Sequence, residues 1–179
     1  RTQTMKQTRF TSIGYLIIPL LIAVMGVSCS VSYKFSGTSI DYSRTKTIYV
    51  RDFTNQAQMV YAPLTDVLNE TVKDIYARQT RLSLVNRNGD LEIEGEITNY
   101  DISSMSIQAD AIAAETRLTI RVKVRFTNNK NHDEDFERTY TSFRNFSSNL
   151  MLNDVQDELI TEMTKEIAEL IFNDTVANW

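Results

Sequence analysis

The sequence contains a single cysteine, Cys29, and so has no partner for an internal disulfide. It also contains one histidine, five glycines and two prolines. A lone cysteine cannot form a cysteine-based zinc site, and no glycine-rich phosphate loop is present. The scarcity of glycine and proline favours long helices and strands over irregular loops.

Positive charge is also in short supply. The formal net charge of −4 combines +3 in residues 1–28 with −7 in the rest of the 179 residues. Nucleic-acid binding requires a basic surface that releases counterions, so the acidic remainder argues against a nucleic-acid partner. An apolar share of 42% and a charged share of 23% are typical of a folded globular domain.

The N-terminal segment has the pattern of a secretory signal. Met5 is the expected start, which leaves residues 1–4 upstream of it. Lys6 and Arg9 precede an apolar run of 15 residues, Ile13–Val27. A membrane-spanning helix needs roughly 20 apolar residues, so we interpret residues 1–28 as a signal peptide with its upstream residues.

The residues directly before Cys29 are small or short: Gly26, Val27 and Ser28. They resemble the lipobox of bacterial lipoproteins, in which the cysteine receives the lipid, although Leu is more usual than Gly26 three residues before it. The alternative is an ordinary signal peptide that is cleaved near a cysteine by coincidence. Lipidation explains the short run, the small residues and the lone cysteine together. We therefore predict that Cys29 is acylated, with palmitate-type chains that hold the protein on a membrane surface.

Residues 29–46 are then the lipidated cysteine and a polar leader, and residues 47–179 form one domain. Alternating apolar residues predict strands, and apolar residues at spacings of three and four predict two helices. The first helix is expected to begin at Pro63 and the second to be capped by Asn153 or Asp154. The strands are expected at residues 47–53, 82–85, from 91 onward, 117–126 and 136–146.

This order predicts an α+β fold, a mostly antiparallel four- to five-stranded sheet with two helices packed on one face. The other face of the sheet is expected to stay polar. Asn88-Gly89 predicts a hairpin between the second and third strands. We also expect the strand from residue 91 to continue through Ile102 and Ile107, with a bulge near Ser103–Ser104.

Catalytic signals are weak. His132 lies in a polar turn and is interpreted as a solvated loop residue. Glu92, Glu94 and Glu96 alternate along one strand face, whereas acid–base catalysis requires two carboxyl groups in different environments, usually with one of them buried. The sequence therefore predicts no enzyme, no metal site and no cofactor.

A row of basic residues on one predicted strand has two explanations. The cations can pair with the glutamates of the neighbouring strand, which contributes about 0–1 kcal/mol for each exposed ion pair. Alternatively, several cations on a rigid sheet can bind phosphate groups of a lipid headgroup. Both explanations hold together if only some of the cations are neutralised. The row consists of Arg117, Arg121, Lys123 and Arg125.

Several short segments follow the lipidation site in a characteristic order. They are Tyr33–Ile40, Leu84–Asn86, Gly89–Leu91, Glu94–Tyr100, Arg117–Ile120 and Val124–Asn128. Together they resemble the divergent LptE-like branch of the LptE family of lipopolysaccharide-assembly lipoproteins. The resemblance covers nearly all of residues 29–179.

The resemblance implies an outer-membrane lipoprotein, anchored on the periplasmic side, that sits inside the β-barrel protein LptD. The two proteins together would insert lipopolysaccharide into the outer leaflet. An α+β domain with two helices on a sheet is also implied, in agreement with the independent prediction. Family members are thought to bind lipopolysaccharide through basic residues on the sheet side. The resemblance therefore adds support for an anion site in the basic row and leaves both explanations open.

The sequence and the resemblance together leave two candidate functions. The first is a non-enzymatic assembly factor that partners LptD and contacts lipopolysaccharide. The second is a freestanding, lipid-anchored periplasmic carrier or adaptor for an amphiphile or for another envelope complex. A stable complex with a large β-barrel would distinguish the first from the second.

Overall fold

In the computed structural model, residues 40–105 and 114–176 are described. The predicted signal peptide, Cys29 and most of the predicted leader lie outside these ranges, as does Ile107. All described residues belong to one compact unit, Ser36–Trp179. Within the described ranges, no helix combines the length and the apolar character needed to cross a membrane.

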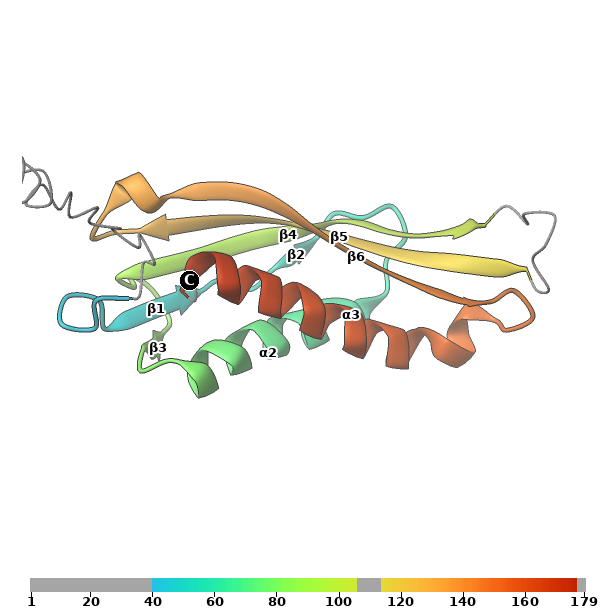
Figure 1. The fold of residues 1–179 in the computed structure, drawn as a ribbon, viewed down its shortest axis with the longest axis horizontal. Helices are drawn as coiled ribbons and strands as arrows, with labels where there is room; N and C mark the ends of the chain where they lie inside the picture. Colours follow the sequence, from blue (N-terminus) through green and yellow to red (C-terminus); the bar gives the residue numbers. More distant parts are fainter. Residues whose placement is uncertain (1–39, 106–113, 177–179) are drawn as a thin grey trace, which may run out of the picture. The chain divides into compact units, whose positions relative to one another are not determined.

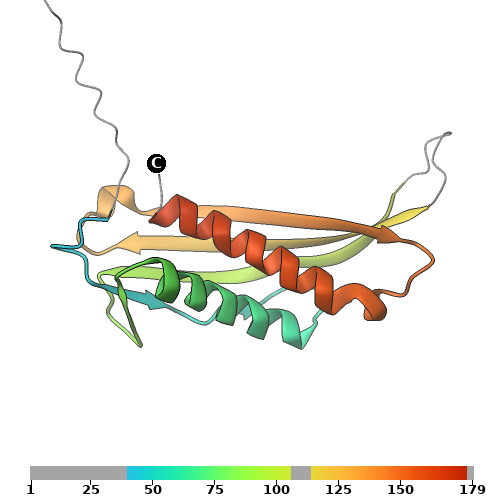
Figure 2. The same ribbon diagram turned by 60° about the horizontal axis from the view of Figure 1, so that its bottom comes forward.

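The fold is a mixed sheet covered on one face by two helices. Figure 1 shows the helices along one side of the long strands, and Figure 2 shows that they lie next to each other. The strands are ordered β3-β1-β4-β5-β6, with β2 also paired to β4. The elements in chain order are β1 (Thr47–Val50), β2 (Thr54–Asn55), α2 (Ala62–Gln79), β3 (Ser83–Val85), β4 (Leu91–Ser104), β5 (Glu115–Asn128), η1 (His132–Glu134), β6 (Phe136–Ser147) and α3 (Leu152–Thr175).

The predicted α+β class is confirmed. The long strands β4, β5 and β6 are antiparallel, whereas the short strands β1, β2 and β3 add parallel pairs. The core lies between the sheet and the helices. Leu118, Ile120 and Val122 alternate along β5 and are fully buried, as are Met163 and Ile167 of α3. Full burial of such side chains contributes about 1.5–3 kcal/mol each, so these faces fix the helices on the sheet.

The predicted hairpin at Asn88-Gly89 is wrong. β3 and β4 each pair in parallel with β1, which lies between them. The reason is that α2 returns the chain across the sheet, and a strand that follows such a crossover helix runs parallel to the strand before it. Asn88 still makes the turn, with a φ of 51°. Gly89 then passes the backbone of β1 so closely that a Cβ would lie 2.5 Å from Tyr49 N.

A bulge in β4 lies earlier than expected, between Ile97 and Asn99 rather than near Ser103–Ser104. Before the bulge, glutamates occupy the positions that face away from the helices. After it, the extra residue Thr98 shifts the register, and Asn99 becomes the partner of Arg121. The bulge thus divides the open face of the sheet into two chemically different halves.

The second helix also begins differently from the prediction. α3 starts at Leu152, and its N-cap residue Met151 makes no side-chain capping bond. Asn153 and Asp154 therefore lie inside the first turn. The favourable position of Asp154 near the positive end of the helix dipole explains its presence there without a capping role.

A polar network joins the ends of three segments at one end of the sheet. The carboxylate of Asp90 accepts hydrogen bonds from the backbone N–H groups of Lys46 (2.8 Å) and Thr47 (3.1 Å). It also pairs with Lys130 Nζ at 2.8 Å. The hydrogen bond from Lys130, followed by those from the backbone, lowers the pKa of Asp90 well below its usual range.

Candidate functional site

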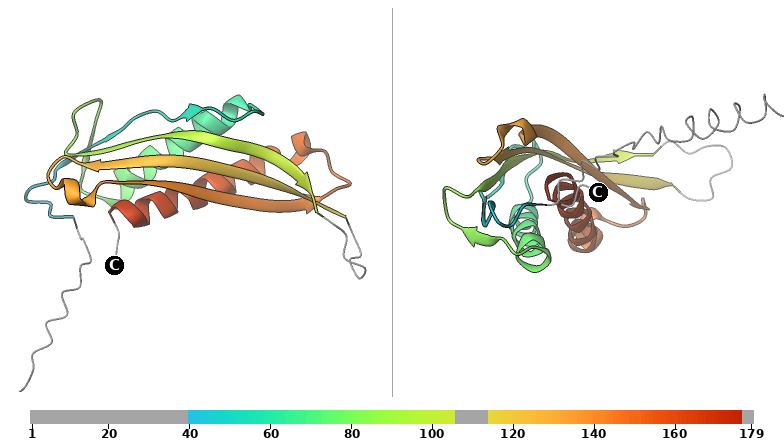
Figure 3. Two further views of the ribbon diagram at one scale, coloured as in Figure 1. Left: turned by 90° about the horizontal axis from the view of Figure 1, so that it is seen from above. Right: turned by 60° about the vertical axis from the view of Figure 1, so that its left-hand side comes forward.

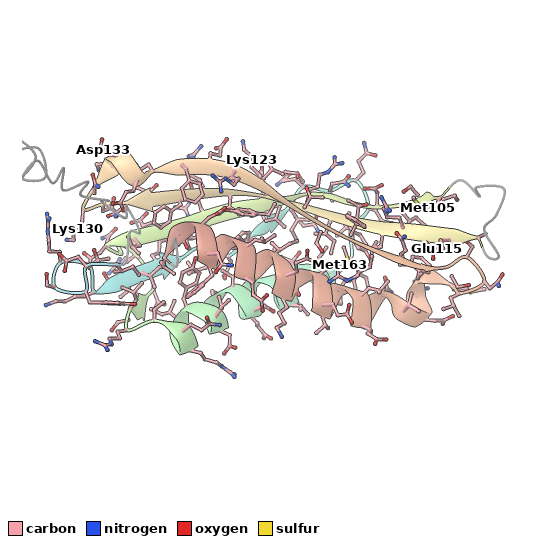
Figure 4. The ribbon with its side chains drawn as sticks, viewed as in Figure 1. Met105, Glu115, Lys123, Lys130, Asp133 and Met163 are labelled. Atoms are coloured by element: carbon pink, nitrogen blue, oxygen red, sulfur yellow. The ribbon has the colours of Figure 1, made fainter. Side chains whose placement is uncertain are left out.

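The face of the sheet opposite the helices, here called the outer face, carries the predicted basic row. Figure 3, left, looks onto this face. All four cations are on β5 at the positions that alternate with the buried ones, so the structure places them on one surface. Figure 4 shows Lys123 projecting away from the helices, with Met105 and Glu115 at one end of the long strands and Lys130 and Asp133 at the other.

In one half of the outer face, the cations are neutralised. The carboxylate of Glu137 in β6 pairs with two of the cations. Its Oε1 lies 2.8 Å from Lys123 Nζ, and its Oε2 lies 3.2 Å from Arg125 Nη2. Glu94 of β4 pairs with Arg125 at 3.3 Å and with Arg51 at 2.8 Å. This half therefore follows the first explanation of the basic row, that of cross-strand ion pairs.

The electrostatics of the neutralised half agree with its geometry. The hydrogen bond from Lys123, and then that from Arg125, lowers the pKa of Glu137. An open depression of about 270 Å³ lies over this cluster, but its cations and carboxylates already satisfy one another. Sequence reasoning missed Arg51 and Glu137. Arg51 directly follows β1, and only the parallel pairing of β1 with β4 brings it to Glu94.

The half beyond the bulge is different. Within the described ranges, neither Arg117 nor Arg121 forms an ion pair with a carboxylate. The guanidinium of Arg117 lies over the ring of Phe143, 4.2 Å from the ring centroid. Its Nε donates a hydrogen bond to Asn145 Oδ1 at 2.9 Å. The basic row therefore contains two cations that remain available to an anion.

Phe143 and Asn145 were not identified from the sequence, yet β6 contains a signal. Phe136, Tyr140 and Phe146 share one parity along the strand and face the helices. Phe143 has the opposite parity and is therefore a large apolar residue on a polar face, where it is 50% exposed.

The other residues considered for catalysis do not form a reactive site. His132 is exposed in η1, and its Nδ1 lies 2.9 Å from Asp135 Oδ2. Among the residues that the structure describes, no three His, Cys, Asp or Glu side chains cluster as metal ligands. Glu94 is held by Arg51 and Arg125, and Glu92 accepts from Asn129 at 3.2 Å. What the described part of β5 offers chemically is the hydrogen-bond donors of Arg117 and Arg121, which suit an anion.

Three solved structures share the fold. A minor lipoprotein from Acinetobacter baumannii matches with a TM-score of 0.50 at 16% identity, over 75% of this chain and 94% of its own. A Xanthomonas campestris protein of the DUF330 family gives 0.52 at 15%, over 74% and 85%. A homologue of a neuraminyllactose-binding hemagglutinin from Helicobacter pylori gives 0.52 at 8%, over 79% and 88%. At these identities, the likeness establishes the fold alone.

Sequence comparison is more specific. No curated protein sequence matches the chain. The LptE family, described by the term lipopolysaccharide-assembly, matches residues 45–175. That match begins at the first residues of the sheet and ends with α3, so it includes the whole α+β layer and both halves of the outer face. The chain therefore belongs to the LptE family of lipopolysaccharide-assembly lipoproteins.

Proposed function

We propose that this protein is held in the outer membrane by lipid on Cys29 and partners an LptD-type β-barrel in lipopolysaccharide assembly. Its membership of the LptE family supports the role, and the signal pattern before Cys29 supports export and anchoring on the periplasmic side. In this proposal the domain orders the barrel and contacts lipopolysaccharide on its way through it.

The observation that carries the lipopolysaccharide contact is the pair of arginines beyond the bulge. Arg117 and Arg121 lie on the outer face without a carboxylate partner among the described residues. Arginine binds phosphate through two parallel hydrogen bonds, which makes it well suited to a phosphorylated glycolipid. Lys123 and Arg125 are part of the predicted row, but Glu94 and Glu137 neutralise them. The acidic remainder of the chain restricts any such contact to a local patch.

Family membership also addresses catalysis. The LptE family is non-enzymatic, so the prediction that the chain is not an enzyme is confirmed. The function that remains to be tested is therefore one of binding and assembly.

The experiment that tests the partner is a pull-down of the tagged, lipidated protein from its native membrane in mild detergent, with mass spectrometry of the bound proteins. A tagged lipoprotein of unrelated fold serves as the control. One abundant large β-barrel near one-to-one with the bait is the expected result. No barrel, or many at trace level, would contradict the partnership and favour the freestanding carrier.

A further inference from the structure

The two available arginines lie on either side of an aromatic ring. In the pairing of β5 with β6, Arg117 faces Asn145, Thr119 faces Phe143 and Arg121 faces Thr141. Phe143 is thus level with the residue midway between the two arginines. Four residues of an extended strand span about 13 Å between Cα atoms, a spacing at which the two arginines are able to contact separate anionic groups of one ligand.

Arg117 is fixed before any ligand arrives. The ring of Phe143 supports its guanidinium at 4.2 Å, and Asn145 accepts its Nε–H at 2.9 Å. Asn145 is itself held, because its Nδ2 donates to Glu115 Oε2 at 2.9 Å. A guanidinium carries five N–H donors, and the remaining donors of Arg117 have no acceptor among the described residues. Such pre-orientation lowers the entropic cost of binding a ligand.

The surroundings of Phe143 are polar. Thr119 and Thr141 supply hydroxyl groups next to the ring, and Asp101 faces Thr119 from β4. Asp101 already accepts a hydrogen bond from Asn99, and Glu115 from Asn145, so both carboxylates are oriented and able to accept a further donor. A half-exposed ring among hydroxyl, amide and carboxylate groups is suited to a sugar. The C–H groups of a sugar can pack on the aromatic ring, and its hydroxyl groups can donate hydrogen bonds to the carboxylate oxygens.

We propose that Arg117, Arg121 and Phe143 form a site for a phosphorylated saccharide. The sugar packs on the part of the Phe143 ring that Arg117 leaves exposed, and the two arginines bind anionic groups beside it. Asn145 is a positioning residue for Arg117. This inference rests on the proposed lipopolysaccharide contact and adds that the contact is made to the sugar-phosphate part of the ligand.

The test uses the full-length protein in detergent and isothermal titration with lipopolysaccharide saccharide from which every acyl chain has been removed and the phosphates kept. We expect saturable binding that is lost when the same saccharide is dephosphorylated. Arg117→Gln should weaken it about tenfold. Phe143→Leu should weaken it about two- to fivefold, and Phe143→Tyr should bind like the wild type because it keeps the ring. Asn145→Ala should raise the Kd with an unchanged melting temperature.

Arg125→Gln is the matched control, since Arg125 lies on the same strand and face but is already neutralised by Glu94 and Glu137. The Kd of this variant for the saccharide should equal that of the wild type. If Phe143→Leu binds like the wild type while Arg117→Gln is weaker, the role of the ring is refuted. If inorganic phosphate displaces the saccharide at equal concentration, the site binds free phosphate, and the proposed contribution of the sugar to binding is refuted. If intact lipopolysaccharide binds and the deacylated saccharide does not, the inference fails while the proposed function stands.

Discussion

Arg125 and Glu137 face each other directly across β5 and β6, with Arg125 Nη2 at 3.2 Å from Glu137 Oε2. Glu137 also binds Lys123, and Glu94 binds Arg125 from the other side. The protein's own carboxylates thus occupy the positions that phosphates of a ligand would take on these cations. The same row of β5 therefore contains an occupied part and an available part.

Removing the two carboxylates should make the occupied part available. In the double variant Glu94→Gln and Glu137→Gln, we expect lipopolysaccharide to bind about three- to tenfold more tightly, because three cations lose their internal partners. Exposed ion pairs contribute only about 0–1 kcal/mol each, so the free energy of unfolding should change little. Titration of the variant with lipopolysaccharide, together with thermal melting, measures both effects.

Glu96→Gln provides the control for net charge. Glu96 faces Lys123 on the same surface but forms no ion pair with a described residue. Glu96→Gln removes one negative charge and the double variant removes two. A gain in binding free energy for Glu96→Gln of half that of the double variant would mean that overall charge, and not release of the paired cations, determines binding.

Neutralising the available arginines should have the opposite effect. Arg117→Gln with Arg121→Gln should weaken lipopolysaccharide binding at least tenfold and reduce its dependence on salt, since two phosphate contacts are lost. Lys123→Gln with Arg125→Gln removes the same charge from the same strand and should have a much smaller effect. Binding measured at two salt concentrations distinguishes the pairs, and equal losses would contradict the division of the outer face.

Asp90→Asn should lower the free energy of unfolding by about 1–3 kcal/mol at neutral pH, because the carboxylate accepts two backbone N–H groups and binds Lys130. The pKa of Asp90 is lowered in the folded protein. Its contribution is therefore present above its unfolded pKa, near 4, and is lost as pH falls through the folded pKa. The difference between wild type and variant should shrink as the pH is lowered below about 4.

Urea unfolding at a series of pH values measures this difference. Asp66→Asn is a suitable control, since Asp66 is exposed on α2 and has no hydrogen-bond partner among the described side chains. A gap between wild type and Asp90→Asn that stays constant down to pH 2 would show that packing, and not charge, is the cause.

Gly95→Ala should destabilise the fold by about 1–3 kcal/mol. A Cβ at this position would lie 2.6 Å from Phe53 Cε1 and 2.6 Å from the backbone oxygen of Lys123. Phe53 is itself 2% exposed, with its N–H held by Asn69 Oδ1 at 2.7 Å, so it has little room to move. Thermal melting tests this, with Thr98→Ala in the same strand as a control that should melt close to the wild type.

Cys29→Ala should leave an unlipidated precursor that no longer fractionates with the outer membrane. The reason is that the acyl chains supply the anchoring energy, at about 0.8 kcal/mol per buried methylene. Membrane fractionation and mass determination of the mature protein measure location and lipid together. Normal fractionation of the variant would refute the anchor at Cys29.

The sequence predicted the elements with strong periodicity and missed those set by distant pairing. The alternation of Leu118, Ile120 and Val122 correctly identified the buried face of β5, and the helical stripes correctly placed both helices on one face. The hairpin predicted from Asn88-Gly89 was wrong because a local turn signal does not indicate that β1 lies between β3 and β4. That arrangement depends on the crossover through α2.

The candidate site was predicted in the same partial way. Sequence alternation placed the four cations of β5 on one face. Which of them is neutralised depends on Arg51, which a parallel neighbour brings to Glu94, and on Glu137, which the β5–β6 register brings to Arg125. The bulge at Thr98 also has no signal in the neighbouring sequence. It nevertheless ends the row of glutamates and leaves Arg121 opposite Asn99.

The network around Asp90 has a mechanical consequence. With the lipid on Cys29, as proposed, any pull between membrane and domain enters the sheet at Lys46, where Asp90 clamps the backbone. β1 begins at the next residue and lies between β3 and β4, parallel to both. Traction along β1 therefore loads the hydrogen bonds to both neighbours in shear, all at once, and not one after another as in a zipper.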